Sequence, residues 1–244
     1  MTNQISGAPS GLKELDEALK GGFTKPANLL IIGAPLCEKR EMGMYILNKG
    51  LEREESVIYI STSQTAEEIR SHWKQYGFEP NWEQAGRVKF VDCYSKMLGV
   101  NCSDTPSVHR IPSILDYTKL SVTVNEMCSG YLLNNIGVRL MLDSLSSFLI
   151  YSSLQTVMRF LHVFLGQLRK QNVLGFFLLE EGAHEEATFN QLKTFSNGAI
   201  KFDQSRKTLQ LEGFLGSPST PIHYEIASGS VGLREARSAN SGEN

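Results

Sequence analysis

Short apolar runs alternate with helix-like stretches along most of this chain, and this alternation restricts its fold more than any other feature. The run NLLII at residues 28–32 ends at Gly33, and a helical stretch from Lys39 to Leu51 follows. Strands that alternate with helices predict a mainly parallel sheet flanked by helices, which is an α/β fold. The predicted strands span residues 28–32, 57–61, 88–91, 138–143 and 174–180, and the predicted helices span residues 11–20, 39–51, 65–76, 115–128 and 154–170.

The pattern changes after Asn197 and Gly198. Short runs at residues 199–203, 209–214 and 222–227, with turn residues between them, predict an antiparallel edge at the C-terminal end of the sheet. From Ser228 onward the chain has few apolar residues that could pack. We therefore predict a single domain over residues 1–227, which suits a chain of 244 residues, and a flexible polar tail over residues 228–244.

Composition excludes several classes of function. The net charge of -2 and the absence of clustered Lys and Arg argue against binding to nucleic acid or to anionic membranes. No apolar stretch is long enough to cross a bilayer, and the first residues lack the features of a signal peptide, so we expect a cytoplasmic protein. The cysteines form no CxxC pair and have no nearby histidine, so we expect reduced thiols and no metal site.

The loop after the first strand matches part of a phosphate-binding motif. That motif reads GxxxxGK followed by Ser or Thr: backbone amides wrap the phosphates, the lysine reaches them, and the hydroxyl binds Mg²⁺. Here the segment is GAPLCEKR, in which Gly33 and Lys39 match. Glu38 stands in place of the second glycine and Arg40 in place of the hydroxyl, so this is a degenerate Walker A motif.

Further segments resemble KaiC-like proteins of the RecA superfamily, and the resemblance runs from about Gly11 to Ile226. It implies a RecA-like P-loop fold, an archaeal source, and a nucleotide site whose remnant here would be Gly33, Lys39, Arg40 and the Walker B acid Asp143. The segments that carry the resemblance are GLKELDEALKGGF, VIYISTSQTAEEI, VRLMLDSLSSFLIY and LEEGAHEEATFNQLKTFSNGAIKFD.

The resemblance also shows which site elements are missing. The paired glutamates that similar proteins carry after the second strand align with Ser63 and Gln64, so the general base is absent. The Lys-x-Arg pair that reaches a neighbouring subunit's phosphate aligns with Gly213 and Leu215. Phosphoryl transfer depends on these groups together, so we expect no catalytic residues and no ATP hydrolysis.

Nucleotide binding is a separate question. If Glu38 faced the phosphates, two like charges about 4 Å apart would repel by roughly 4 kcal/mol at an effective dielectric of about 20, so ATP binding would be weak. Alternatively, the Glu38 carboxylate could itself occupy the free amides at the helix N-terminus, with Lys39 and Arg40 nearby, and hold the loop closed. Asp143 could also serve only as a capping residue of a turn or helix.

Other polar residues are better explained by structure than by chemistry. Glu180, Glu181 and Glu186 with His184 could form a metal or acid–base cluster at a strand end, but we interpret them as loop and helix-start residues. The remaining histidines, which are His72, His109, His162 and His223, have no partners at metal-ligand spacing.

The leading hypothesis is a catalytically inactive KaiC-like regulatory or assembly protein that acts through protein–protein contacts. Its partner would be a copy of itself or an active KaiC-like relative. One alternative is an ATP-binding protein or weak ATPase in signal transduction. The other is an accessory protein of DNA recombination or repair, which the lack of a basic face opposes.

Overall fold

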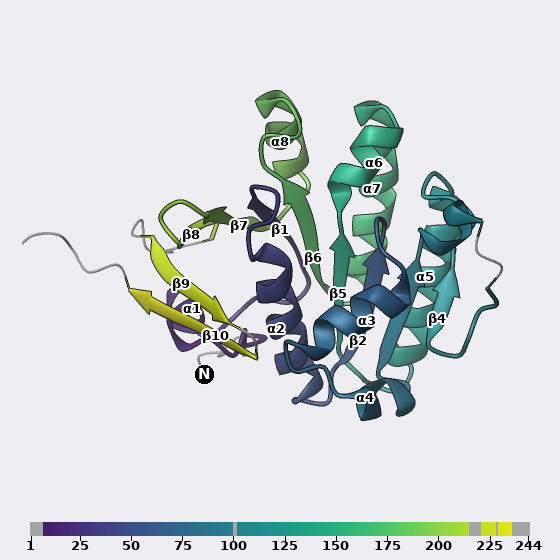
Figure 1. The fold of residues 1–244 in the computed structure, drawn as a ribbon, viewed down its shortest axis with the longest axis horizontal. Coiled ribbons are helices and arrows are strands. Elements are labelled where there is room, and N and C mark those ends of the chain that lie inside the picture. Colours follow the sequence, from purple (N-terminus) through teal and green to yellow (C-terminus); the bar gives the residue numbers. More distant parts are fainter. Residues whose placement is uncertain (1–6, 100–101, 215–220, 228, 236–244) are drawn as a thin grey trace, which may run out of the picture.

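The structure is a computed structural model that describes residues 7–99, 102–214, 221–227 and 229–235 (Figure 1). Its centre is a ten-stranded sheet in the order β10-β9-β8-β7-β1-β6-β5-β2-β3-β4. The strands from β7 to β4 in this order run parallel, whereas β8, β9 and β10 are antiparallel. The prediction of a mainly parallel sheet with a C-terminal antiparallel edge is therefore confirmed. The strands are β1 (Ala27–Gly33), β2 (Ser56–Ser61), β3 (Val88–Asp92), β4 (Val108–Arg110), β5 (Val138–Asp143), β6 (Leu174–Glu180), β7 (Gly198–Asp203), β8 (Thr208–Glu212), β9 (Ile222–Ala227) and β10 (Ser230–Glu235).

Helices cover both faces of this sheet (Figure 1). On β1, Leu29 and Ile31 pack into one core with α1 to α4, while Leu30 and Ile32 pack into a second core with α5 to α8. A strand covered on both faces needs apolar side chains at every position, which explains why β1 reads as a continuous apolar run. The helices are α1 (Lys13–Ala18), α2 (Lys39–Leu51), α3 (Ala66–Lys74), α4 (Pro80–Gln84), α5 (Tyr117–Leu132), α6 (Leu145–Tyr151), α7 (Leu154–Lys170) and α8 (Glu186–Lys193), and one 3₁₀ turn spans Ser95–Leu98.

The sheet continues beyond the predicted end of the domain. The prediction of a flexible polar tail over residues 228–244 is wrong for residues 230–235, because β10 pairs with β9 and buries Leu233. The alternation of Val231 and Leu233 with small or charged residues after Gly229 is a hairpin signal. The polar composition of the surrounding residues concealed this signal. Residues 236–244 lie outside the described part of the chain.

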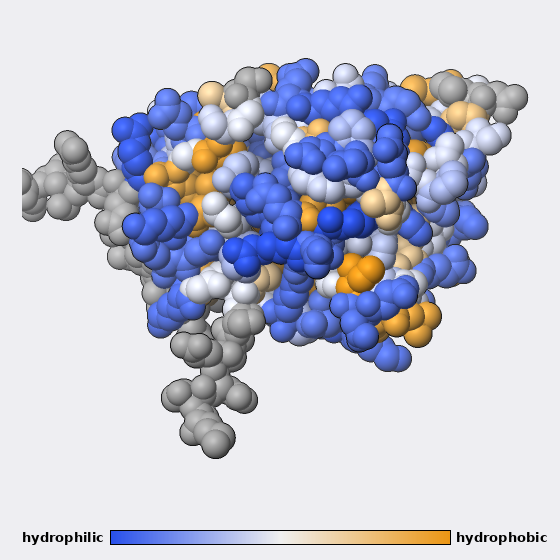
Figure 2. All heavy atoms as spheres, turned by 90° about the horizontal axis from the view of Figure 1, so that it is seen from below, coloured by the Kyte–Doolittle hydropathy of each residue, from blue (hydrophilic) through white to orange (hydrophobic). Residues whose placement is uncertain are grey.

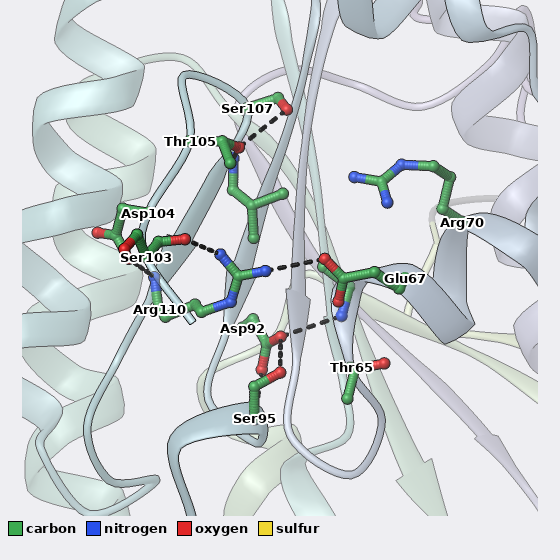
Figure 3. Close-up of polar contacts among 12 residues, drawn as sticks. Thr65, Glu67, Arg70, Asp92, Ser95, Ser103, Asp104, Thr105, Ser107 and Arg110 are labelled. Atoms are coloured by element: carbon green, nitrogen blue, oxygen red, sulfur yellow. Dashed lines mark hydrogen bonds and ion pairs between the residues drawn. The ribbon is translucent and has the colours of Figure 1, made fainter. Parts of the chain in front are cut away.

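The edge of the sheet at β4 is closed by the preceding loop (Figure 3). The backbone amide of Val108 donates to Thr105 Oγ1 over 3.0 Å, and that of Arg110 donates to Asp104 Oδ1 over 3.0 Å. The buried Arg110 guanidinium fixes this loop, because it donates to the Ser103 carbonyl at 2.5 Å and pairs with a Glu67 carboxylate oxygen at 2.8 Å. A strand edge whose amides are satisfied in this way offers nothing to another strand.

A second charged cluster lies among the starts of the parallel strands. Arg139 on β5 is completely buried, pairs with Glu55, and donates to the carbonyls of Ile46 at 2.7 Å and Pro9 at 3.0 Å. Lys25 pairs with the same glutamate.

Figure 2, which looks at the molecule from below, shows a largely hydrophilic face with smaller hydrophobic patches. Within the described residues, no helix combines the length and the hydropathy needed to cross a membrane.

Candidate remnant nucleotide site

The four residues predicted from the sequence come together where the parallel strands end. Gly33 is the last residue of β1, Lys39 and Arg40 open α2, and Asp143 is the last residue of β5. In open α/β sheets, ligands bind at the carboxyl ends of the strands, so this is the place where a site would be expected. The structure thus assembles the predicted residues, and their partners determine what they can do.

Lys39 is held by the protein itself. Its Nζ lies 2.6 Å from Glu180 Oε2 and 3.0 Å from the Ala34 carbonyl oxygen, and only 3% of the residue is exposed. Glu180 ends β6, which lies beside β1 with Gly33 opposite Glu180 in the register. Glu180 ends this strand as the predicted range of residues 174–180 has it, so its other interpretation as a loop or helix-start residue is wrong, whereas Glu186 begins α8 as expected.

Arg40 and Asp143 form a second ion pair. The Arg40 Nε lies 2.5 Å from Asp143 Oδ2, and its Nη2 lies 3.3 Å from Oδ1. The hydroxyl of Tyr59, fully buried on the adjacent strand β2, donates to Asp143 Oδ2 over 2.7 Å. Burial, and then the neighbouring carboxylate, raise the pKa of Tyr59 well above its ordinary value, so the phenol stays protonated. Burial lowers the pKa of Arg40, but Asp143 outweighs burial and the pKa is raised. Both carboxylate oxygens are thus engaged by the chain.

The loop between β1 and α2 packs against itself. The Cys37 amide donates to the Ala34 carbonyl over 3.2 Å, and a methyl group added at Gly33 would meet the Cys37 sulfur at 2.5 Å. Cys37 therefore lies over Gly33, in a position that glycine alone allows. Burial raises the pKa of the Cys37 thiol, which keeps it neutral. Leu36, with φ of 64°, forms the exposed tip of the loop.

Glu38 points away from this loop. It is the N-cap residue of α2, but its side chain accepts no capping hydrogen bond. Its carboxylate pairs instead with Lys207, from the turn between β7 and β8, and accepts a hydrogen bond of 3.2 Å from the Tyr224 hydroxyl on β9. Burial raises the pKa of Glu38, but Lys207 outweighs this and the pKa is lowered. The hypothesis that Glu38 fills the loop is therefore wrong, and Glu180 is the carboxylate that faces Lys39.

The other predicted elements are placed as follows. Ser63 and Gln64 lie between the end of β2 and Thr65, the N-cap of α3, so neither position carries a carboxylate. Gly213 follows β8 directly, and Leu215 lies outside the described residues. Over the ranges that the structure describes, no three His, Cys, Asp or Glu side chains form a group that could hold a metal ion.

Sequence reasoning did not assign two residues to this site: it named Glu180 only in a possible cluster at a strand end, and it did not consider Tyr59. Glu180 was recognisable as an acid that ends a buried strand, the same signal that singled out Asp143, but its partner Lys39 lies 141 positions away. Tyr59 reads as one more residue of an apolar strand. No local signal shows that its hydroxyl reaches Asp143.

Comparisons with known proteins agree with this architecture. The model of the KaiC ATPase family matches residues 8–214. No curated protein matches the chain. Among solved structures, the chain resembles the uncharacterized protein PH0321 from Pyrococcus horikoshii, which was crystallised with an unknown peptide. The TM-score is 0.76 at 17% identity, over 93% of this chain and 99% of that one.

A second similar structure is the KaiC-like protein PH0186 from Pyrococcus horikoshii OT3. Its TM-score is 0.71 at 14% identity, over 92% of this chain and 97% of that one. At these identities the two structures support the fold, and the family is established by the match over residues 8–214. The chain belongs to the KaiC family of ATPase domains.

Proposed function

We propose that this chain is a KaiC-family domain that does not hydrolyse ATP and that acts by binding other proteins. The observation that carries the proposal is the pairing of its two loop cations with its own carboxylates, Lys39 with Glu180 and Arg40 with Asp143. In a working site, a lysine like Lys39 is available to phosphate and the strand-end acid is available to Mg²⁺. Here Lys39 would first have to leave Glu180, and Asp143 would first have to leave Arg40.

The residues of this site do not fit ATP with Mg²⁺. A phosphate that reached Lys39 would lie beside Glu180, and two like charges about 4 Å apart repel by roughly 4 kcal/mol at an effective dielectric of about 20, which is nearly three decades of affinity. Arg40 stands where the motif has its metal-binding hydroxyl, and no glutamate stands at Ser63 or Gln64 to activate water. We therefore infer that the site stabilises the fold.

The retained fold and one similar structure support a protein partner. The domain keeps a ten-stranded sheet with helices on both faces. The similar protein PH0321 was crystallised with an unknown peptide. A domain that retains its fold without the chemistry of its site can still offer its surfaces for recognition. We infer that the partner is a protein, either a second copy, an active KaiC-like relative or an unrelated chain.

One observation favours a second candidate, an ATP-binding sensor or weak ATPase. The family to which the chain belongs is described by its ATPase activity, and Lys39 keeps its position at the start of α2. In that case Glu180 would act as a gate that ATP displaces. Weak binding that strengthens when Glu180 is neutralised would distinguish this candidate from the first.

Phosphate release from ATP in the presence of Mg²⁺ tests the proposed function. We expect the wild-type protein to release phosphate no faster than the Lys39→Ala and Asp143→Ala variants. Those two variants are the matched controls, because any turnover in this site would require both residues. Turnover by the wild type that either substitution abolishes would contradict the proposal.

A further inference from the structure

The strands β4 and β9, near opposite ends of the sheet, differ in whether their backbone N–H groups have partners within the described residues. At β4, the outward amides of Val108 and Arg110 are taken up by the preceding loop (Figure 3). Near the other end, β9 lies one strand in from the edge strand β10, and it is longer than the part of β8 that pairs with it. The paired residues are Ile222 with Leu209 and His223 with Thr208, and the Tyr224 amide donates to the Lys207 carbonyl over 2.9 Å.

Beyond Tyr224, the neighbouring chain turns away from β9. Lys207 has φ of 52°, and the turn that it ends carries the chain from β7 to β8. Backbone groups of alternate residues in a strand point to the same side, so the N–H and C=O of Ile226 point to the side on which Tyr224 bonds Lys207. Within the described residues, no strand pairs with Ile226 on that side.

A hollow lies next to this unpaired stretch. It measures about 800 Å³ and is bounded by Glu38 before α2, Lys207 in the turn, Tyr224 and Ile226 on β9, and Arg234 on β10. This volume falls within the range of roughly 300–1,000 Å³ typical of ligand-binding pockets. We name this hollow, together with the free edge of β9 at residues 225–227, the edge slot.

We propose that the edge slot binds an extended segment of a partner protein, which adds to the sheet alongside β9 in line with β8. This inference rests on the proposed function and names the place where the partner docks. An extended segment is the occupant that an unpaired strand edge selects, because its own N–H and C=O groups complete the ladder. The half-buried side chain of Ile226 favours an apolar residue opposite it.

The edge slot adjoins the degenerate loop. Glu38 bounds the slot and occupies the N-cap position of α2, and its carboxylate is held by Lys207 and the Tyr224 hydroxyl. A segment bound alongside β9 would therefore contact the same three residues that hold the start of α2. The partner would occupy a place beside the remnant nucleotide site, although not the position of the phosphates.

Hydrogen exchange of single backbone amides, followed by NMR, tests this site. The probe is a synthetic peptide of alternating sequence, Thr-Val-Lys-Val-Thr-Val-Lys-Thr, and the matched control is the same peptide N-methylated at every residue, which cannot donate to a strand edge. In the free protein the Ile226 amide should exchange quickly. The probe should slow its exchange at least tenfold, and the N-methylated peptide should not.

A pair of variants isolates the backbone group. Ile226→Pro removes the N–H that faces the edge slot but none of the hydrogen bonds to β10, which use the neighbouring residues, and proline is tolerated at such edge positions. Ile226→Val keeps the N–H. We expect the proline variant to bind the probe at least fivefold more weakly than the wild type and the valine variant to bind it normally.

Three results would overturn the edge slot: slow exchange of the Ile226 amide in the free protein, no binding of the probe at millimolar concentration, or binding that leaves this amide unprotected. None of these results involves nucleotide binding. Each would therefore contradict the docking site without contradicting the proposal that the domain does not hydrolyse ATP. Conversely, ATP turnover at Lys39 would remove the proposed function without affecting the exchange of Ile226.

Discussion

Two clusters of buried charge lie at opposite ends of the parallel strands, and they differ in how completely they are enclosed. At the starts of the strands, Arg139 is fully buried and all three of its guanidinium nitrogens meet protein acceptors. At the carboxyl ends, Lys39 and Arg40 each meet one carboxylate. The side chains of Glu180 and Arg40 stay partly exposed, at 26% and 28% of their surface.

The difference separates a purely structural cluster from one that stands where a ligand binds in related folds. Arg139 is tightly packed, since a methyl group added at Gly50 would lie 2.5 Å from the Arg139 Nε. At the other end, Glu180 and Asp143 face the loop that related folds use for phosphate, and they supply the negative charge there themselves. Substitutions at the first cluster should therefore affect folding, and those at the second should affect folding less and anion binding more.

The largest effect should come from Arg139→Met. It removes the main partner of Glu55 and the hydrogen bonds that the guanidinium donates to the carbonyls of Ile46 and Pro9. Breaking a buried ion pair from one side costs about 3–5 kcal/mol. Urea denaturation measures this loss of stability. The matched substitution at the other cluster, Arg40→Met, should cost clearly less because Arg40 is partly exposed. Equal losses of stability for Arg139→Met and Arg40→Met would contradict the proposed difference between the two clusters.

The coupling between Lys39 and Glu180 should be the next largest. A double-mutant cycle with Lys39→Met and Glu180→Gln should give an interaction energy of about 1–3 kcal/mol, as for other residues in direct contact. The double variant should be more stable than the sum of the two single losses predicts, because it leaves no unpaired charge. A coupling near zero would mean that the pair does not hold the loop.

Acid should weaken the cluster around Arg139 through Glu55. Burial raises the pKa of Glu55, but Arg139 and Lys25 outweigh burial, so the pKa is lowered from its ordinary value of 4.5. A carboxyl group with a lowered pKa in the folded state contributes stability that is fully present above pH 4.5 and is lost as the pH falls through the folded value. Stability measured from neutral pH to about pH 3 should fall less steeply in Glu55→Gln than in the wild type. Parallel curves would contradict this assignment.

The smallest effect should come from Tyr59→Phe. It removes the hydroxyl that donates to Asp143 and leaves the ring in place, so the expected cost is about 1 kcal/mol. Denaturation measures it, with Tyr45→Phe as the control, since the contact of the Tyr45 hydroxyl with the Gly11 carbonyl is exposed and 3.5 Å long. If both substitutions were neutral, the Asp143 carboxylate would depend on Arg40 alone.

Much of this fold could be predicted because the sheet is covered on both sides. Strands buried on both faces are apolar throughout, and the ends of β5 and β6 at Asp143 and Glu180 agree with the predicted ranges. Several short elements were missed: β4 has only three residues, and α4 and α6 lie between stronger patterns. Of α8, only the start near Glu186 was expected. β10 was missed because its composition is that of a polar tail.

The sequence predicted which residues form the candidate site but not which ion pairs they make. The phosphate-loop motif located Gly33, Lys39 and Arg40, and the resemblance to KaiC-like proteins added Asp143. The structure brings the four together because the parallel strands β1 and β5 end at the same edge of the sheet. Which carboxylate faces Lys39 depends on the neighbour of β1 in the sheet, and that neighbour is β6. Likewise, Glu38 turns away because two C-terminal elements bring a cation and a phenol to it, which no local pattern reveals.

Calorimetric titration with ATP and Mg²⁺ tests the central claim most directly, with the wild type beside a variant that carries Glu38→Gly, Arg40→Thr and Glu180→Gln. The variant regains the motif and frees Lys39. We predict no saturable heat from the wild type at millimolar nucleotide, where binding is worth only about -4 kcal/mol, and measurable binding by the variant. Saturable binding by the wild type that Lys39→Ala abolishes would contradict the account.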